Sequence, residues 1–213
     1  MFNVERGDTV TAAQRAPAAV ADPIKRAMDV IVALGMLIFT LPVTLPAAAF
    51  VALTSEGPIF FSQRRTGLNG QTFMILKFRS MRVRQEGGFR QATRDDDRIT
   101  PIGRFLRRSS MDELPQLLNI LKGEMSLVGP RPHAVDHDAQ CRAVIADYDA
   151  RYLVRPGLTG LAQVSGLRGE SGDDHMAERV RLDIAYIERW SIVLDLKILC
   201  KTAAVVLFQK QAY

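Results

Sequence analysis

Residues Val30 to Ser55 read VIVALGMLIFTLPVTLPAAAFVALTS, an uninterrupted stretch without a formal charge. A helix in a soluble core is rarely apolar over such a length, so the first expectation is contact with a membrane. The stretch is too long, and begins too far from the N-terminus, for a cleaved signal peptide. It therefore predicts a protein that stays attached to a membrane.

Two prolines, Pro42 and Pro46, lie near the middle of this stretch. Each removes an i→i−4 hydrogen bond, at a cost of about 3 kcal/mol in an ordinary helix. A straight helix of this length would measure about 39 Å, more than the roughly 30 Å of a hydrocarbon core. Divided at the prolines, each arm is about 18–20 Å long and too short to cross. The sequence predicts a helix that is broken inside the membrane.

Basic residues flank both ends of the apolar stretch. Lys25 and Arg26 precede it, and Arg64 and Arg65 follow it. Positive charges favour the cytoplasmic side, and here they favour it at both ends. We therefore expect a re-entrant helix that enters and leaves the membrane by the same face. A proline-kinked helix that spans the membrane is the alternative.

The charge of the chain is concentrated next to this segment. The 213 residues carry a net charge of +5, whereas residues 60–110 alone carry +8. Such a basic region indicates an anionic partner, which the charge alone leaves open between nucleic acid, anionic lipid and a phosphorylated substrate. A content of 47% hydrophobic residues and only two cysteines argue against a disordered chain and a disulfide scaffold.

The remaining patterns predict an α+β fold that is mostly helical, with a small β-hairpin. Residues 58–63 and 72–78 read as two strands joined by an Asn-Gly turn. Helices are expected from Leu114 to Gly123 and over 134–153, 176–190 and 193–208. The predicted organisation is a flexible tail (1–22), a re-entrant helix-break-helix (23–57) and a cytosolic or interfacial catalytic domain with amphipathic helices (58–213).

The densest group of chemically active residues surrounds Asp112 and Glu113. Pro115 follows in what must be the first turn of a helix, so capping is the ordinary interpretation of the two acids. The arginines nearby change that interpretation, because Arg107 lies upstream and Arg131 is held between two prolines. Carboxylates and guanidinium groups beside a helix N-terminus suit a metal-bound phosphate ester. One carboxylate could bind Mg²⁺ or attack phosphorus while the other handles a proton.

Three further cations could face the same anion. Lys77 and Arg79 close the second predicted strand, and Arg155 begins a loop rich in glycine and proline. Such loops are usually simple turns, although their N–H groups can also contact a phosphate.

Several segments together resemble the monotopic phosphoglycosyl transferases, bacterial sugar transferases that begin exopolysaccharide, capsule and O-antigen assembly. The similarity runs from about Lys25 to the C-terminus, and the long central motif is highly specific. The matching segments are KRAMDV (25–30), KFRSM (77–81), DRITPIGRFLRRSSMDELPQLLNILKGEMSLVGPRP (97–132), RPGLTGLAQVSG (155–166) and DIAYIERWSIVLDLKIL (183–199).

The resemblance implies transfer of a sugar 1-phosphate from a UDP-sugar to polyprenyl (undecaprenyl) phosphate, with release of UMP. It also implies Mg²⁺, a position in the bacterial inner membrane at its cytosolic face, and glucose or galactose as the sugar. Membrane lipid is then a partner and nucleic acid is not, while a homo-oligomer stays open.

The resemblance also assigns roles to individual residues. It makes Asp112 the nucleophile, which carries a phosphosugar and contributes to the metal site, and Glu113 its partner. The membrane break corresponds to Pro42 and Pro46, although the first proline follows Leu41 here and not the serine of some members. The expected phosphate-binding residues are Arg107, Arg131, Lys77, Arg79 and Arg155.

One rival from another class is a non-catalytic, membrane-tethered binder of anionic lipid or polymer. It explains the basic region but gives no reason for two acids beside Arg131. A nucleic-acid-binding protein is a weaker rival, since the sequence contains no recognisable nucleic-acid-binding motif.

Overall fold

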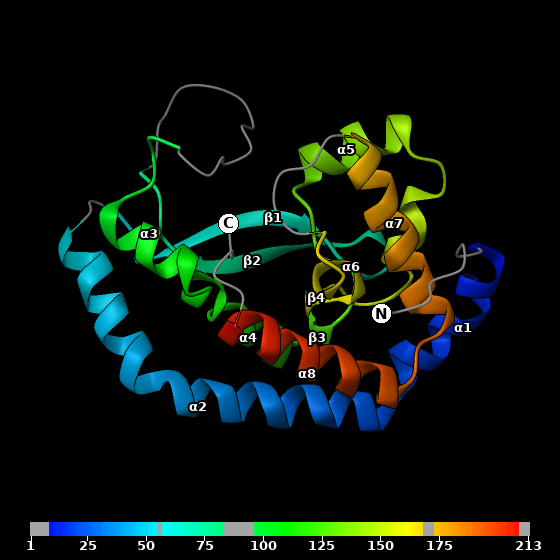
Figure 1. Cartoon of the computed structure of the whole chain (residues 1–213), viewed down its shortest axis with the longest axis horizontal. Coiled ribbons are helices and arrows are strands. Elements are labelled where there is room, and N and C mark those ends of the chain that lie inside the picture. Colours follow the sequence, from blue (N-terminus) through cyan, green and yellow to red (C-terminus); the bar gives the residue numbers. More distant parts are fainter. Residues whose placement is uncertain (1–8, 55–56, 83–95, 168–172, 209–213) are drawn as a thin grey trace.

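The computed structural model describes residues 9–54, 57–82, 96–167 and 173–208. Within these ranges the chain is mostly helical, with one β-hairpin and one short parallel strand pair, as predicted for the fold class (Figure 1). The α-helices are α1 (Thr9–Ala21), α2 (Pro23–Thr54), α3 (Pro101–Arg108), α4 (Gln116–Lys122), α5 (Val135–Val144), α6 (Leu161–Val164), α7 (Asp173–Glu188) and α8 (Ile192–Phe208). The strands are β1 (Phe60–Thr66), β2 (Thr72–Phe78), β3 (Ser126–Val128) and β4 (Gly157–Thr159), and 3₁₀ turns cover Leu68–Gly70, Met111–Glu113 and Tyr148–Leu153.

The hairpin forms where the sequence predicts it. Strands β1 and β2 pair antiparallel, from Phe60 opposite Phe78 to Thr66 opposite Thr72. Asn69 and Gly70 turn the chain with φ values of 54° and 74°, a conformation that asparagine and glycine tolerate best. Lys77 is the last residue but one of β2, opposite Phe61, so the hairpin places a cation near one end of the sheet.

Strands β3 and β4 form a parallel pair that the sequence analysis missed. Ser126 lies opposite Gly157, and Val128 lies opposite Thr159. A Cβ atom on Gly157 would fall 2.1 Å from the backbone nitrogen of Gly129, so only glycine permits this approach. The loop beginning at Arg155 is therefore part of a sheet, and its Gly157 N–H already donates to the carbonyl of Pro130.

The predicted flexible tail needs a correction. Residues 9–21 form helix α1, which packs against α7, whereas residues 1–8 lie outside the described part of the chain. Ala12, Ala16 and Ala19 are buried on one side of α1. Because alanine favours helix and leaves room for a close neighbour, an Ala-rich segment can dock without a strong periodic pattern.

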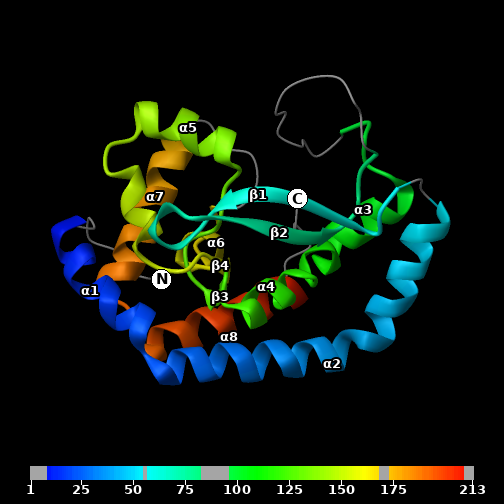
Figure 2. The ribbon, with the colours of Figure 1, turned by 180° about the vertical axis from the view of Figure 1, so that it is seen from behind.

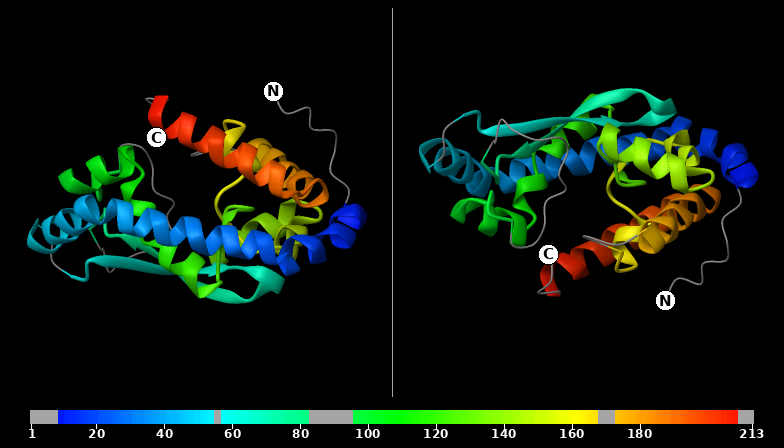
Figure 3. Two further views of the ribbon diagram at one scale, coloured as in Figure 1. Left: turned by 90° about the horizontal axis from the view of Figure 1, so that it is seen from below. Right: turned by 90° about the horizontal axis from the view of Figure 1, so that it is seen from above.

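Helix α2 is long and apolar enough to cross a membrane, judged by length and composition, and most of its large side chains are exposed. Pro42 and Pro46 lie inside one continuous helix, whose ribbon bends along its length (Figures 1 and 2). Seen from below, α2 runs along the molecule between α8 on one side and the hairpin on the other (Figure 3). An apolar helix that could lie in a membrane is thus confirmed. The predicted break at Pro42 and Pro46 is not, because the helix continues through both prolines, and its re-entrant placement stays a prediction.

Both ends of α2 contact the rest of the protein. Its first half packs on α4 and β3. Near its far end, Val51 is fully buried in a small cluster with Phe78 of β2 and Leu106 of α3. The middle of the helix is left exposed, with Phe39 at 85%. Helix α2 therefore touches the body at both ends and leaves its apolar middle uncovered.

Candidate active site

Asp112 and Glu113 lie on a 3₁₀ turn between α3 and α4. Ser110 turns the chain out of α3 with φ 57°, and helical geometry continues from Met111 through Pro115 into α4. The residue that precedes α4 is Pro115, and Asp112 lies four residues before the first residue of that helix. Capping therefore does not explain this acid.

Glu113 holds two cations from other elements. Lys77 Nζ, at the end of β2, lies 2.7 Å from Glu113 Oε1. Arg131, which follows β3, donates to both carboxylate oxygens, through Nη2 to Oε1 at 2.5 Å and through Nη1 to Oε2 at 3.3 Å. One carboxylate thus fixes the positions of a lysine and an arginine that lie more than fifty residues apart in the sequence.

Asp112 differs from its neighbour in its surroundings. Its side chain is buried, with the residue 4% exposed. Burial and the adjacent charge of Glu113 raise the pKa of Asp112 to about 6, although Lys77, Arg107 and Arg131 oppose the shift. Asp112 is therefore ionised at neutral pH, although its burial and the charge of Glu113 make the ionised form less favourable.

The pKa of Glu113 moves in the opposite direction. Burial alone would raise it, but the charges of Arg131 and Lys77 and their hydrogen bonds hold it well below its ordinary value. Two adjacent acids thus have separated pKa values, a pattern found where two carboxyl groups have different tasks.

Arg107 completes the group of cations. It lies in the last turn of α3, where its charge stabilises the ionised form of Asp112 and its Nη1 contacts Met81 Sδ at 3.3 Å. Lys77, Arg107 and Arg131 therefore surround two carboxylates, which leaves one positive charge in excess. A phosphate group that enters beside Asp112 meets positive charge on several sides.

The backbone of Arg131 is held by a buried ion pair, Arg151–Asp183, that the sequence did not predict. Arg151 Nη2 donates to the carbonyl of Arg131 at 2.6 Å, and Arg151 Nε bonds Asp183 of α7 at 2.8 Å. Both partners of this ion pair are almost fully buried. Burial raises the pKa of Asp183, and Arg151 opposes that shift. The pair fixes the backbone from which Arg131 reaches Glu113.

Two predicted phosphate-binding residues lie elsewhere. Arg79 is 3% exposed and donates through Nη2 to the carbonyl of Val51 in α2, at 3.4 Å. Arg155 donates to the carbonyls of Gly123 and Val20, at 3.0 and 3.2 Å. The structure does not bring either arginine to the acids; each instead holds backbone segments together.

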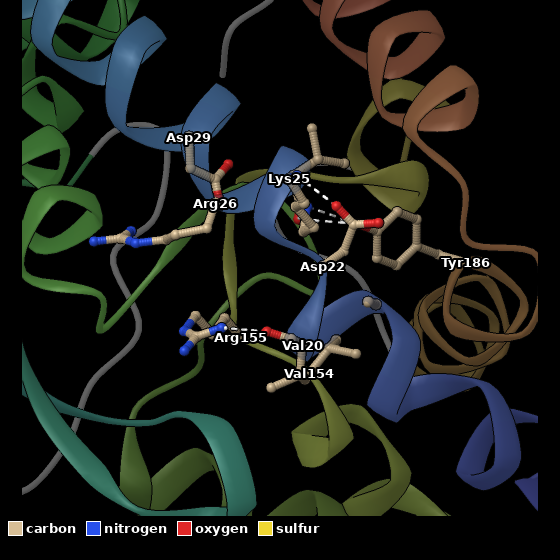
Figure 4. A pocket seen from close by; sticks show the side chains of 10 residues that line it. Val20, Asp22, Lys25, Arg26, Asp29, Val154, Arg155 and Tyr186 are labelled. Carbon is tan, nitrogen blue, oxygen red and sulfur yellow. Dashed lines mark hydrogen bonds between the residues drawn. The ribbon is translucent and has the colours of Figure 1, made fainter.

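The basic residues at the start of α2 contact the rest of the protein, and Figure 4 shows Lys25 beside Tyr186 of α7. Lys25 Nζ lies 2.7 Å from Asp195 of α8 and 3.2 Å from the carbonyl of Val128. Arg26 donates to the carbonyls of Ile120 and Leu121, the last turn of α4. These basic residues therefore anchor the helix, in addition to any effect of their charge at the membrane surface.

A divalent metal at this site would be held mainly by the phosphate oxygens of the substrate. Among the described residues, no group of three or more His, Cys, Asp or Glu side chains is placed to hold an ion. Mg²⁺ is commonly held by one or two carboxylates together with substrate phosphates. Asp112 beside a bound diphosphate fits that pattern.

Comparison with known proteins places this arrangement in a family. Residues 20–209 match the model of the bacterial sugar transferases. The chain belongs to that family. A UDP-glucose:undecaprenyl-phosphate glucose-1-phosphate transferase of Caulobacter vibrioides is 50% identical over 199 residues, which cover 92% of this chain and 74% of the relative. The family membership accounts for the resemblance seen in the sequence motifs.

Two other relatives are covered by this chain to different extents than the Caulobacter protein. The enzyme of the same name from Xanthomonas campestris pv. campestris is 50% identical over 192 residues, which cover 89% of this chain but only 40% of the relative. The exopolysaccharide production protein PSS of Rhizobium leguminosarum bv. phaseoli is 42% identical over 185 residues, or 84% of this chain and 92% of that protein. The chain thus spans less than half of the Xanthomonas relative and most of the Rhizobium one.

Proposed function

We propose that this protein transfers glucose 1-phosphate from UDP-glucose to undecaprenyl phosphate, releases UMP, and so begins the synthesis of an exopolysaccharide. The names of the relatives from Caulobacter and Xanthomonas support the two substrates, and that of the Rhizobium relative supports the pathway. The observation that carries the proposal is Asp112, a buried carboxylate whose pKa is raised by burial and which lies under the influence of three cations, Lys77, Arg107 and Arg131.

In the first step, an ionised oxygen of Asp112 attacks the sugar-bearing phosphorus of UDP-glucose. The bond from that phosphorus to the bridging oxygen breaks, and UMP leaves with the electron pair. Lys77, Arg107 and Arg131 offset the charge on the phosphoryl oxygens and on the leaving group. The protein is left with glucose 1-phosphate joined to Asp112 as an acyl phosphate.

In the second step, an oxygen of undecaprenyl phosphate attacks the same phosphorus, and the Asp112 carboxylate leaves. The acceptor needs no base, because a phosphate monoester is largely ionised at neutral pH, with a second pKa of about 6. The lowered pKa of Glu113 makes it a poor base, so its role in our proposal is to position Lys77 and Arg131.

Mg²⁺ fits the donor set at this site. Asp112 would hold the ion together with oxygens of the diphosphate. When bound, it neutralises phosphate charge and orients the leaving group.

The placement of α2 in our proposal is re-entrant, with the bend at Pro42 and Pro46 inside the cytosolic leaflet of the inner membrane. The contacts at both ends of the helix support this placement. Lys25 ties its start to α8, and Val51 ties its end to β2 and α3. A spanning helix would carry one of these ends to the far side of the membrane, away from the body that both ends contact.

The function is tested by offering a panel of UDP-sugars to the purified protein in lipid nanodiscs with radiolabelled undecaprenyl phosphate. We expect lipid product from UDP-glucose, and a loss of at least about a thousandfold in Asp112→Asn. The control is membrane association, which Asp112→Asn should retain in full. Product formation by this variant at the wild-type rate, or no product from any UDP-sugar with the wild-type protein, would contradict the proposal.

A further inference from the structure

Gln116, the first residue of α4, has a buried side-chain amide whose N–H donors have no hydrogen-bond partner among the described residues. The residue is 1% exposed, and its Nε2 donates to no group among the described residues. An unpaired amide donor in such a place destabilises the folded protein, because it has lost its hydrogen bonds to water. Because the unpaired donor does not stabilise the fold, its presence calls for a functional explanation.

A second buried amide on the same helix shows the contrast. Asn119 is fully buried, and its Oδ1 accepts from the N–H of Leu76 at 3.0 Å. Its Nδ2 donates to the carbonyl of Met74 at 2.8 Å. Asn119 therefore joins α4 to β2, which is the ordinary structural use of a buried amide. Gln116 makes no such connection.

The helical register places Gln116 beside the two acids. It follows Glu113 by three residues, the spacing that puts side chains on one face of a 3₁₀ turn, and Asp112 by four. Between them the chain has 3₁₀-type hydrogen bonds, from Leu117 N to Leu114 O and from Leu118 N to Pro115 O, both 3.0 Å, and Leu114 and Pro115 keep helical dihedral angles. Helical side chains lean toward the N-terminus, so the amide leans back over the turn that carries Asp112.

We propose that Gln116 is a further substrate-contacting residue, whose amide donates a hydrogen bond to a non-bridging oxygen of the phosphoryl group in transfer. The inference rests on the proposed function. The lysine and arginines supply charge to the phosphate, and a neutral donor fixes its orientation without changing the pKa of Asp112. Gln116 forms and breaks no covalent bond and exchanges no proton.

Gln116→Met tests this role, because methionine keeps the length of the side chain and removes the donor. With UDP-glucose as the probe, we expect the rate of UMP release in a single turnover to fall about tenfold to a hundredfold, the effect of one hydrogen bond to a charged group. The melting temperature should stay the same or rise, since an unpaired buried amide is removed. Gln71→Met, at an exposed position of the hairpin turn, is the matched control and should change neither quantity.

Three other outcomes would overturn the inference. A wild-type rate in Gln116→Met removes the contact and leaves the proposed function intact. A slow reaction together with a lower melting temperature, as expected for Asn119→Leu, identifies Gln116 as a structural residue. If the wild-type protein releases no UMP from UDP-glucose, the proposed function and this inference fail together.

Discussion

At the scale of single residues, the site depends on two adjacent acids in different surroundings. Glu113 is fixed by two cations and stays ionised. Asp112 lies outside these two ion pairs, and burial raises its pKa. A nucleophile gains from this arrangement, because its oxygens are not occupied by Lys77 and Arg131.

The pH dependence of the first step follows from these surroundings. Because the attacking oxygen must be ionised, the single-turnover rate of UMP release should rise about tenfold per pH unit below about 6 and level off above it. The stability of the folded protein changes in the opposite direction. Because the pKa of Asp112 in the folded protein lies above its ordinary value of 3.8, the protein loses stability as the pH rises from about 4 through about 6. Asp112→Asn should therefore raise the melting temperature at neutral pH, as measured in nanodiscs.

Glu113→Gln is the control for this profile. Its negative charge contributes to the raised pKa of Asp112, so its removal should shift the midpoint of the rate profile to lower pH. The maximal rate should also fall, because Lys77 and Arg131 lose their common partner. A midpoint that stays in place would contradict the coupling between the two acids.

The sequence identified most of the residues that meet at the site, and it did so from local patterns. Asp112 and Glu113 stand together in the chain, and the prolines around Arg131 mark a rigid turn. The partners of Arg79 and Arg155 could not be predicted, because a basic residue has the same pattern whether it meets phosphate or a distant carbonyl. The spacing of Gln116 from the acids was a signal that the sequence analysis did not use.

At the scale of elements, long periodic segments were predictable and short or non-local ones were not. The hairpin and the helices α4, α7 and α8 lie close to their predicted positions. Strands β3 and β4 have three residues each, too few to show the alternation of apolar and polar residues that marks a strand. Their pairing also joins segments about thirty residues apart in the sequence. Helix α3 also escaped prediction, although Thr100 caps it by accepting from Gly103 N–H at 3.0 Å and Pro101 starts it.

The attachment of α2 to α8 gives a prediction at this scale. Lys25 and Asp195 form a buried ion pair, and Tyr186 also donates to Asp195, at 2.8 Å. Lys25→Met leaves a carboxylate buried without its cation and should cost about 3–5 kcal/mol of unfolding free energy. The double variant Lys25→Met/Asp195→Asn should lose less than the sum of the two single variants.

The exposed pair Arg181–Glu178 on α7 is the matched control for this cycle. Its side chains are 58% and 46% exposed, so Arg181→Met should cost less than about 1 kcal/mol. Denaturant unfolding of the nanodisc-bound protein measures all of these variants. Additive losses for Lys25 and Asp195 would show that the pair does not fasten α2 to α8.

At the scale of the whole molecule, the arched α2 relates the active site to the membrane. Its apolar middle is exposed, while its two ends contact the body that carries Asp112 (Figure 2). In our proposal, a lipid-linked phosphate at the membrane surface and a soluble nucleotide sugar can then reach one site. The proposed re-entrant anchor would keep the reacting groups at that boundary without a helix that crosses the membrane.

The topology makes a clear prediction for labelling of intact cells. A single cysteine at Ala13, exposed on α1, should react with a membrane-impermeant maleimide only after the cells are permeabilised. Cys141 and Cys200 are first replaced by serine, since both are free thiols. A cysteine at Gln71 in the hairpin is the control for the cytosolic side and should behave in the same way. Labelling at position 13 from outside intact cells would favour a spanning helix.

The mass of the intact protein after reaction with UDP-glucose tests the central claim most directly. Without undecaprenyl phosphate, the reaction should stop after the first step. We predict a gain of one hexose phosphate per chain, located at Asp112 by peptide mapping and lost when undecaprenyl phosphate is added. An unmodified protein that nevertheless converts both substrates, or an adduct on another residue, would contradict the account.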